Sequence, residues 1–227
     1  MQDKYVHLLS EILKINFVYS AIINFRHFGF VGLLKMPIVI QYGSRIRCKA
    51  RNGVAFLKPM HLNMLTIKNG NNIFVEKGGT LLFTGDKACF NKNNQVIVYG
   101  NGTFKIGNNF WVNASSEFYC NKELIFGDDV LIGFHVIFLD SDYHPIFNDQ
   151  NKIMNHDRRI ILGNNVWIST NVTVLKGTHI GNNIIVGASS LVTGKLLEDN
   201  SIYCGNPAKP VKTGISWRIS HPDFWQN

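Results

Sequence analysis

Aliphatic residues recur at every sixth position through the second half of the chain. The series is Leu162, Ile168, Val174, Ile180, Val186 and Val192. An amphipathic helix would space apolar residues by three or four positions, and a half-buried strand would alternate them every two, so neither explains this period. The period is typical of a parallel β-helix, in which three short strands form one triangular coil and stacked coils bury a continuous core.

An earlier block has the same spacing. It consists of Ile106, Val112, Phe118 and Leu124. The pattern then shifts by two residues to Phe126, Ile132 and Phe138, which predicts a small bulge between coils. Upstream, between about residues 67 and 104, the apolar positions are less regular, so we expect irregular early coils.

The tripeptide Gly-Asn-Asn recurs at the positions where corners are needed. It begins at Gly70, Gly107, Gly163 and Gly181. Glycine and asparagine accept a positive φ at low cost, so both are expected to do so at these corners. The step from Gly163 to Gly181 predicts one full coil of 18 residues.

The flanking segments lack the repeat. Residues 1–40 carry apolar positions at helical spacing and predict an N-terminal helical cap that covers the first coil or contacts a membrane surface. The left-handed β-helix is expected over 41–212, with a catalytic loop at 139–161. The aromatic tail, 213–227, is expected to pack against the last coil or a neighbouring subunit.

The amino-acid composition limits the classes of binding partner and the cellular compartment that we expect. Apolar residues make up 45% of the chain and charged residues 17%, which excludes disorder. The net charge of +8 favours an anionic partner: nucleic acid, membrane phosphate, an acidic polysaccharide or a phosphorylated cofactor. The four cysteines include no CxxC pair, and we find neither a cleavable signal nor a spanning segment. We therefore expect a cytoplasmic protein, held at most loosely at the inner face of a membrane.

The repeat stops between Phe138 and Leu162, where the polar sequence Asp-Ser-Asp-Tyr-His-Pro predicts a loop. His144 is its candidate general base, because imidazole titrates near neutrality and can accept a hydroxyl proton. Asp142 could hold the ring or favour its protonated form, although a backbone carbonyl could do the same. His135 and His179 are not spaced to complete a zinc site with His144, so no metal is expected.

Five motifs together resemble the hexapeptide-repeat acyltransferases. They are Gly127–Ile132, His144–Pro145, Leu162–Ile168, Ile180–Ser190 and Gly205–Lys209. The resemblance is to the galactoside, maltose and nodulation-factor O-acetyltransferases, and especially to the polysaccharide-modifying members. It implies that the chain is an enzyme that transfers an acetyl group from acetyl-CoA.

The resemblance also implies site residues. It makes His144 the general base, with Asp142 beside it, and assigns Asn113 and Tyr143 to the acceptor. The donor residues that it implies are Trp167, Ser169, Thr170, Ala188, Thr193, Lys195, Lys209 and Lys212. Lys195 is displaced by one residue from the Thr-Lys pair of the family, which puts that phosphate contact in doubt.

These observations predict an O-acetyltransferase acting on a sugar hydroxyl of a cell-surface glycan, such as capsule, lipopolysaccharide or exopolysaccharide. The acceptor is expected to be acidic or phosphate-linked, and no nucleic-acid partner is expected. The resemblance implies a homotrimer whose sites lie between subunits. Two alternatives stay open: a nucleotide-sugar N-acetyltransferase, and a non-catalytic glycan-binding solenoid.

Overall fold

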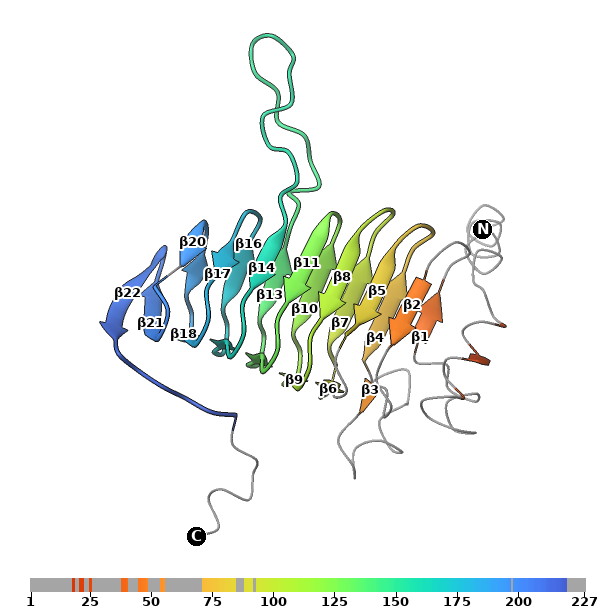
Figure 1. Ribbon diagram of the computed structural model, residues 1–227. Coiled ribbons are helices and arrows are strands. Elements are labelled where there is room, and N and C mark those ends of the chain that lie inside the picture. Colours follow the sequence, from red (N-terminus) through yellow and green to blue (C-terminus); the bar gives the residue numbers. More distant parts are fainter. Residues whose placement is uncertain are drawn as a thin grey trace.

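The chain winds into a parallel β-solenoid (Figure 1). The computed structural model describes residues 18, 21–22, 25, 38–40, 45–48, 54–55, 71–84, 88–91, 93–196 and 198–219. Each coil contributes one strand to each of three sheets, and strands of successive coils pair in parallel. The sequence prediction of a solenoid is therefore confirmed.

The three sheets are named here by their order along a coil. Sheet 1 contains β1 (Ile38–Ile40), β4 (Asn72–Val75), β7 (Gln95–Val98), β10 (Glu117–Cys120), β13 (Ile137–Leu139), β16 (Thr173–Leu175) and β19 (Leu191–Val192). Sheet 2 contains β2 (Arg45–Cys48), β5 (Thr80–Phe83), β8 (Thr103–Ile106), β11 (Glu123–Phe126), β14 (Ile160–Leu162), β17 (His179–Ile180) and β20 (Lys195–Leu196). Sheet 3 contains β3 (Val54–Ala55), β6 (Ala88–Phe90), β9 (Phe110–Val112), β12 (Leu131–Ile132), β15 (Trp167–Ile168), β18 (Ile184–Val186), β21 (Ser201–Gly205) and the antiparallel β22 (Ala208–Thr213). We call the edges where sheets meet corner 1–2, corner 2–3 and corner 3–1.

Two inward positions per strand build the core, and this explains the shift in the repeat. Leu124 and Phe126 are both buried in β11, and β11 keeps a continuous register with β8 and β14. The predicted bulge is therefore wrong: the two series are neighbouring inward positions of the same coils. Phe126 packs against the rings of four other buried phenylalanines, which are Phe104, Phe110, Phe118 and Phe138.

The described strands of the early coils pair in regular register, whereas irregular coils were predicted. Strands β4 and β7 pair over four residues from Asn72↔Gln95 to Val75↔Val98. The step from Ile73 to its neighbour Val96 is longer than the later step from Val174 to Val192. Longer corners in the early coils therefore break the six-residue spacing without breaking the sheets.

The corner glycines are required by close approach and not by their φ. At corner 2–3, a Cβ added to Gly163 would lie 2.6 Å from the carbonyl oxygen of Gly181 in the next coil. Positive φ values belong instead to the second asparagine of the tripeptide, such as Asn165 at 54° and Asn183 at 52°. The prediction for glycine is thus wrong and that for asparagine is confirmed.

The structure describes parts of both terminal segments. Val18, Ala21, Ile22 and Phe25 are helical, and the rest of the predicted cap lies outside the described residues. No helix formed by the described residues is long and apolar enough to span a membrane. Beyond β22 the tail returns along corner 2–3, where Trp217 Nε1 donates to the Asn165 carbonyl (3.0 Å).

Candidate active site

The loop between β13 and β14 leaves the solenoid at corner 1–2 and projects away from it (Figure 1). Its outer part is a hairpin closed by an antiparallel bridge between Phe147 and Ile153. Four large apolar side chains on its arms are exposed: Ile146, Phe147, Ile153 and Met154. The predicted interruption of the repeat is therefore a structured arm.

The base of the loop presents His144 on a tight turn. The His144 N–H donates to the Asp142 carbonyl (2.7 Å), which closes a γ-turn around Tyr143. Tyr143 has a φ of 60°, a conformation that costs energy in a residue with a bulky side chain. Its ring packs against Tyr99 from an earlier coil, at 5.4 Å between centroids. The strained turn is thus held by a contact with the solenoid.

The Asp142 carboxylate faces Lys176 and Asn155 rather than the imidazole. Lys176 Nζ lies 2.5 Å from Asp142 Oδ2, and Asn155 Nδ2 donates to the same oxygen at 2.8 Å. These two hydrogen bonds, led by that from Lys176, lower the pKa of the carboxyl below its ordinary value. Asp142 therefore ties the loop to Lys176, which follows β16 in the next coil.

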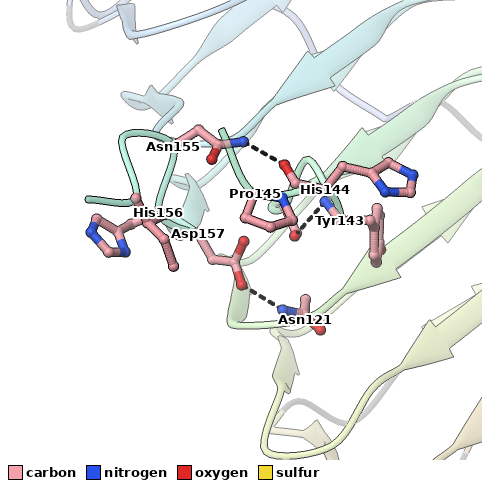
Figure 2. Close-up of a pocket in the computed structure, with 9 residues that line it drawn as sticks. Asn121, Tyr143, His144, Pro145, Asn155, His156 and Asp157 are labelled. Carbon is pink, nitrogen blue, oxygen red and sulfur yellow. Dashed lines mark hydrogen bonds between the residues drawn. The ribbon is translucent and has the colours of Figure 1, made fainter. Parts of the chain in front are cut away.

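A pocket of about 270 Å³ opens beside this turn (Figure 2). Its lining comprises Asn121, Ser141, Tyr143, His144, Pro145, Ile153, Asn155, His156 and Asp157. The rings of His144 and His156 point to opposite sides in Figure 2. Asn121 Nδ2 donates a hydrogen bond to Asp157 Oδ2 (2.5 Å). Sequence reasoning missed Asn121, Asn155, His156 and Asp157, because no repeat or motif distinguishes them from ordinary polar loop residues.

Another group of predicted residues lies at corner 3–1. Asn113 follows β9 there, and Ser169 and Thr170 follow β15. Ala188 lies one coil further on, where the next residue, Ser189, donates its N–H to the Thr170 carbonyl (3.0 Å). Since the His144 loop leaves from corner 1–2, a single chain keeps Asn113 and these predicted donor residues at a different corner from His144.

The remaining donor candidates are divided between sheets 2 and 3. Trp167 is 37% exposed on the outer face of sheet 3 and packs against Trp217 of the tail at 5.9 Å. Lys209 and Lys212 are exposed on β22 of the same sheet. Thr193 follows β19 and Lys195 lies in β20 of sheet 2. The exposed indole and the two lysines of sheet 3 suit an extended anionic donor, whereas Lys195 lies on another face.

In the part of the chain that the structure describes, no group of three or more His, Cys, Asp or Glu side chains is arranged to hold a metal ion.

No protein-family model matches the chain, but individual sequences do. WbbJ of Escherichia coli, provisionally named as an O-acetyl transferase of lipopolysaccharide biosynthesis, is 28% identical over 61% of this chain and 74% of its own length. The galactoside O-acetyltransferase of E. coli is 33% identical over 52% of this chain and 58% of its own length. The polysialic acid O-acetyltransferase of E. coli O1:K1 is 32% identical over 49% of this chain and 37% of its own length.

A solved structure shares the fold. The polysialic-acid-specific acetyltransferase NeuO aligns with a TM-score of 0.55 over 79% of this chain and 87% of its own, at 24% identity. The chain is therefore similar in sequence to several O-acetyltransferases and shares the solenoid fold of NeuO. The predicted resemblance to O-acetyltransferases and the predicted left-handed β-helix are therefore confirmed, and the sequence matches support the predicted acyltransferase class. The chain spans little more than half of the galactoside enzyme and less of the polysialic acid enzyme.

Proposed function

We propose that this protein transfers an acetyl group from acetyl-CoA to a sugar hydroxyl of a cell-surface glycan, with His144 as the general base. The observation that carries the proposal is the presentation of His144 on a strained, tethered turn beside a polar pocket. Strained backbone of this kind concentrates at functional sites. The names of the relatives, which include lipopolysaccharide and polysialic acid enzymes, support a glycan acceptor.

In the proposed reaction, the acyl donor supplies a thioester and His144 accepts the proton of the sugar hydroxyl. The hydroxyl oxygen forms the new ester bond as the carbon–sulfur bond breaks, and the thiol leaves with a proton. No covalent enzyme intermediate is needed. A backbone N–H at corner 3–1 would stabilise the developing oxyanion. Ser169 N–H already donates to Val186 (2.9 Å), while Thr170 N–H has no backbone partner among the described residues, so Thr170 is the better source.

The separation of the two groups of residues implies a second copy of the chain. His144 lies at corner 1–2, and Asn113 and Thr170 lie at corner 3–1, so a complete site requires one corner from each of two subunits. A head-to-tail contact of this kind closes into a ring, and a trimer is the ring we propose.

The outer faces of the sheets support this arrangement. A column of partly exposed apolar side chains crosses sheet 1, formed by Phe74, Ile97, Tyr119, Leu139 and Leu175. A similar column crosses sheet 3, formed by Trp111, Leu131, Trp167, Ile185 and Ile202. Sheet 2 interrupts its own column with Lys105, His179 and Lys195. Apolar faces on sheets 1 and 3, and a charged face on sheet 2, suit packing of sheet 1 of one subunit against sheet 3 of the next.

The test is release of free thiol from acetyl-CoA by the wild type and by His144→Ala. The acceptor panel comprises sialylated, phosphate-linked and neutral oligosaccharides and an amino-sugar nucleotide. We expect transfer to one sugar hydroxyl and a fall of at least about 100-fold in His144→Ala. His179→Ala, on the outer face of sheet 2, is the matched control and should stay within about twofold, as expected for a surface change away from the site.

Three other outcomes would redirect the proposal. Equal rates for the wild type and His144→Ala would exclude His144 as the base. Transfer to the amino-sugar nucleotide alone would identify an N-acetyltransferase. A non-catalytic solenoid would release no thiol, and coenzyme A would not raise its melting temperature in a thermal-shift titration.

A further inference from the structure

The side chain of Lys176 is largely buried against the base of the loop. Its side chain is only 11% exposed, although it belongs to the coil after the loop and not to the loop itself. Nζ donates to Asp142 Oδ2 (2.5 Å) and to the Asn155 carbonyl (2.7 Å). It therefore joins the first arm of the loop to the last arm at the point where both leave the solenoid.

Asn155 extends this connection to the backbone of His144. Its Nδ2 donates to the His144 carbonyl (2.8 Å) as well as to Asp142, and its Oδ1 accepts the N–H of Ile146 (2.7 Å). One amide side chain thus fixes the peptide groups on both sides of Pro145.

Contacts from earlier coils hold the opposite side of the same turn. Tyr99 packs against the Tyr143 ring, and the Asp140 carboxylate accepts backbone N–H groups at the β10–β11 corner. The turn that carries His144 is therefore held between preceding coils and Lys176 of the following coil.

We propose that Lys176 and Asn155 are positioning residues for His144, which they hold through the Asp142 carboxylate and the loop backbone. This inference rests on the proposed role of His144 as general base. Loss of Lys176 leaves the carboxylate with Asn155 alone and separates the last arm of the loop from the solenoid. A strained turn persists only where its surroundings determine it, so the turn should relax and move the imidazole.

The catalytic test compares Lys176→Met with Lys176→Arg. A displacement of about 1 Å can cost about 100-fold in rate, so we expect kcat for Lys176→Met to fall by about 10- to 100-fold. The KM for acetyl-CoA should stay within about twofold, because the donor residues lie on another corner. Lys176→Arg should recover most of the rate, since a guanidinium can donate to both acceptors. Lys105→Met, an exposed lysine on the outer face of sheet 2, is the control and should match the wild type.

Asn155→Asp tests the same connection from within the loop, where a failure to fold is not expected. It removes the two amide N–H donors at nearly constant shape and should lower kcat to a similar extent. The double variant Asp142→Asn/Lys176→Met should be no slower than the slower single variant, because both disrupt one contact. A wild-type kcat in Lys176→Met, or additive effects in the double variant, would overturn the proposal.

Hydrogen exchange tests the positioning independently of any acceptor. Peptides covering residues 141–156 should exchange faster in Lys176→Met than in the wild type, while β13 and β16 keep their protection. Faster exchange in a protein that acetylates no acceptor would support the positioning role and sink the proposed function. Unchanged exchange would overturn the positioning role, whatever the enzyme acetylates.

Discussion

The buried carboxylate of Asp140 accepts a 2.7 Å hydrogen bond from the backbone N–H of Asn121, which lies one coil earlier. The N–H groups of Lys122 (2.8 Å) and Glu123 (2.7 Å) donate to its second oxygen. A single side chain thus satisfies three backbone donors at the corner from which the loop leaves. Asp140 therefore anchors the start of the arm to the preceding coil.

Asp140→Ala should lower the free energy of unfolding by about 3 kcal/mol, because it leaves buried N–H groups without acceptors. Asp140→Asn keeps one acceptor oxygen and should cost less. Urea unfolding monitored by circular dichroism measures both. An alanine variant as stable as the wild type would mean that water or a backbone shift satisfies these donors.

The same carboxylate predicts a pH dependence. Burial raises the pKa of Asp140 above its ordinary value, against the opposing effect of the three N–H donors. Since the folded pKa exceeds the unfolded one, the stabilisation is complete below the unfolded pKa, about 3.9, and is lost as pH rises through the folded pKa. The melting temperature of the wild type relative to Asp140→Asn should therefore increase as the pH falls from 7 towards 4. A decrease would show that the hydrogen bonds outweigh burial.

Much of the fold could be predicted from the sequence, because the six-residue spacing of apolar residues matches one side of a triangular coil. Leu162, Ile168 and Val174 point inward because each six-residue repeat, a short strand with its corner, returns the same position to the inside of the coil. The reason for the corner glycines could not be predicted in the same way. A glycine used for positive φ, such as Gly194, and one used for close approach, such as Gly163, look alike until the neighbouring coil is in place.

The candidate site was predictable only where a motif carried it. His144 stands out as a histidine before proline in an interruption of the repeat, and the structure places it beside a pocket. Lys176 and Asn155 carry no such signal, because their contacts join positions 13 to 34 residues apart through charge and amide groups that are common at corners. The sequence could not predict that Asn113 and Thr170 lie together and away from His144, because this depends on which corner of the coil each turn forms.

Two glycines should respond differently to substitution. Gly163→Ala places a Cβ 2.6 Å from the Gly181 carbonyl oxygen, and such overpacking should cost about 1–3 kcal/mol. Gly163→Asn should cost more, because its larger side chain meets the same carbonyl. Gly194 has a φ of 81° and open space around it, so Gly194→Asn should cost less than Gly194→Ala. Chemical unfolding of the four variants gives the order, and the same order at both positions would contradict the distinction between close approach and φ.

The proposed ring predicts which outer face tolerates a charge. Ile185 lies between Trp167 and Ile202 on sheet 3, and Ile125 lies between Lys105 and Ile161 on sheet 2. Ile185→Arg should dissociate the trimer, since a buried unpaired charge is costly at an interface. Ile125→Arg is the matched control and should leave it intact. Light scattering after size-exclusion chromatography distinguishes the two, and a wild type that is already monomeric would remove the ring from the proposal.

Mixed subunits test whether two copies share one site. His144→Ala and Asn113→Ala should each be inactive or nearly so, because every site then lacks one contribution. In a ring assembled from equal amounts of both chains, a site is intact when its His144 comes from the Asn113→Ala chain and its Asn113 from the His144→Ala chain. Random assembly into a closed ring with one such site at each interface makes this combination about one quarter of all sites. Co-expression should therefore restore about a quarter of the wild-type rate, whereas sites confined within single chains would restore none.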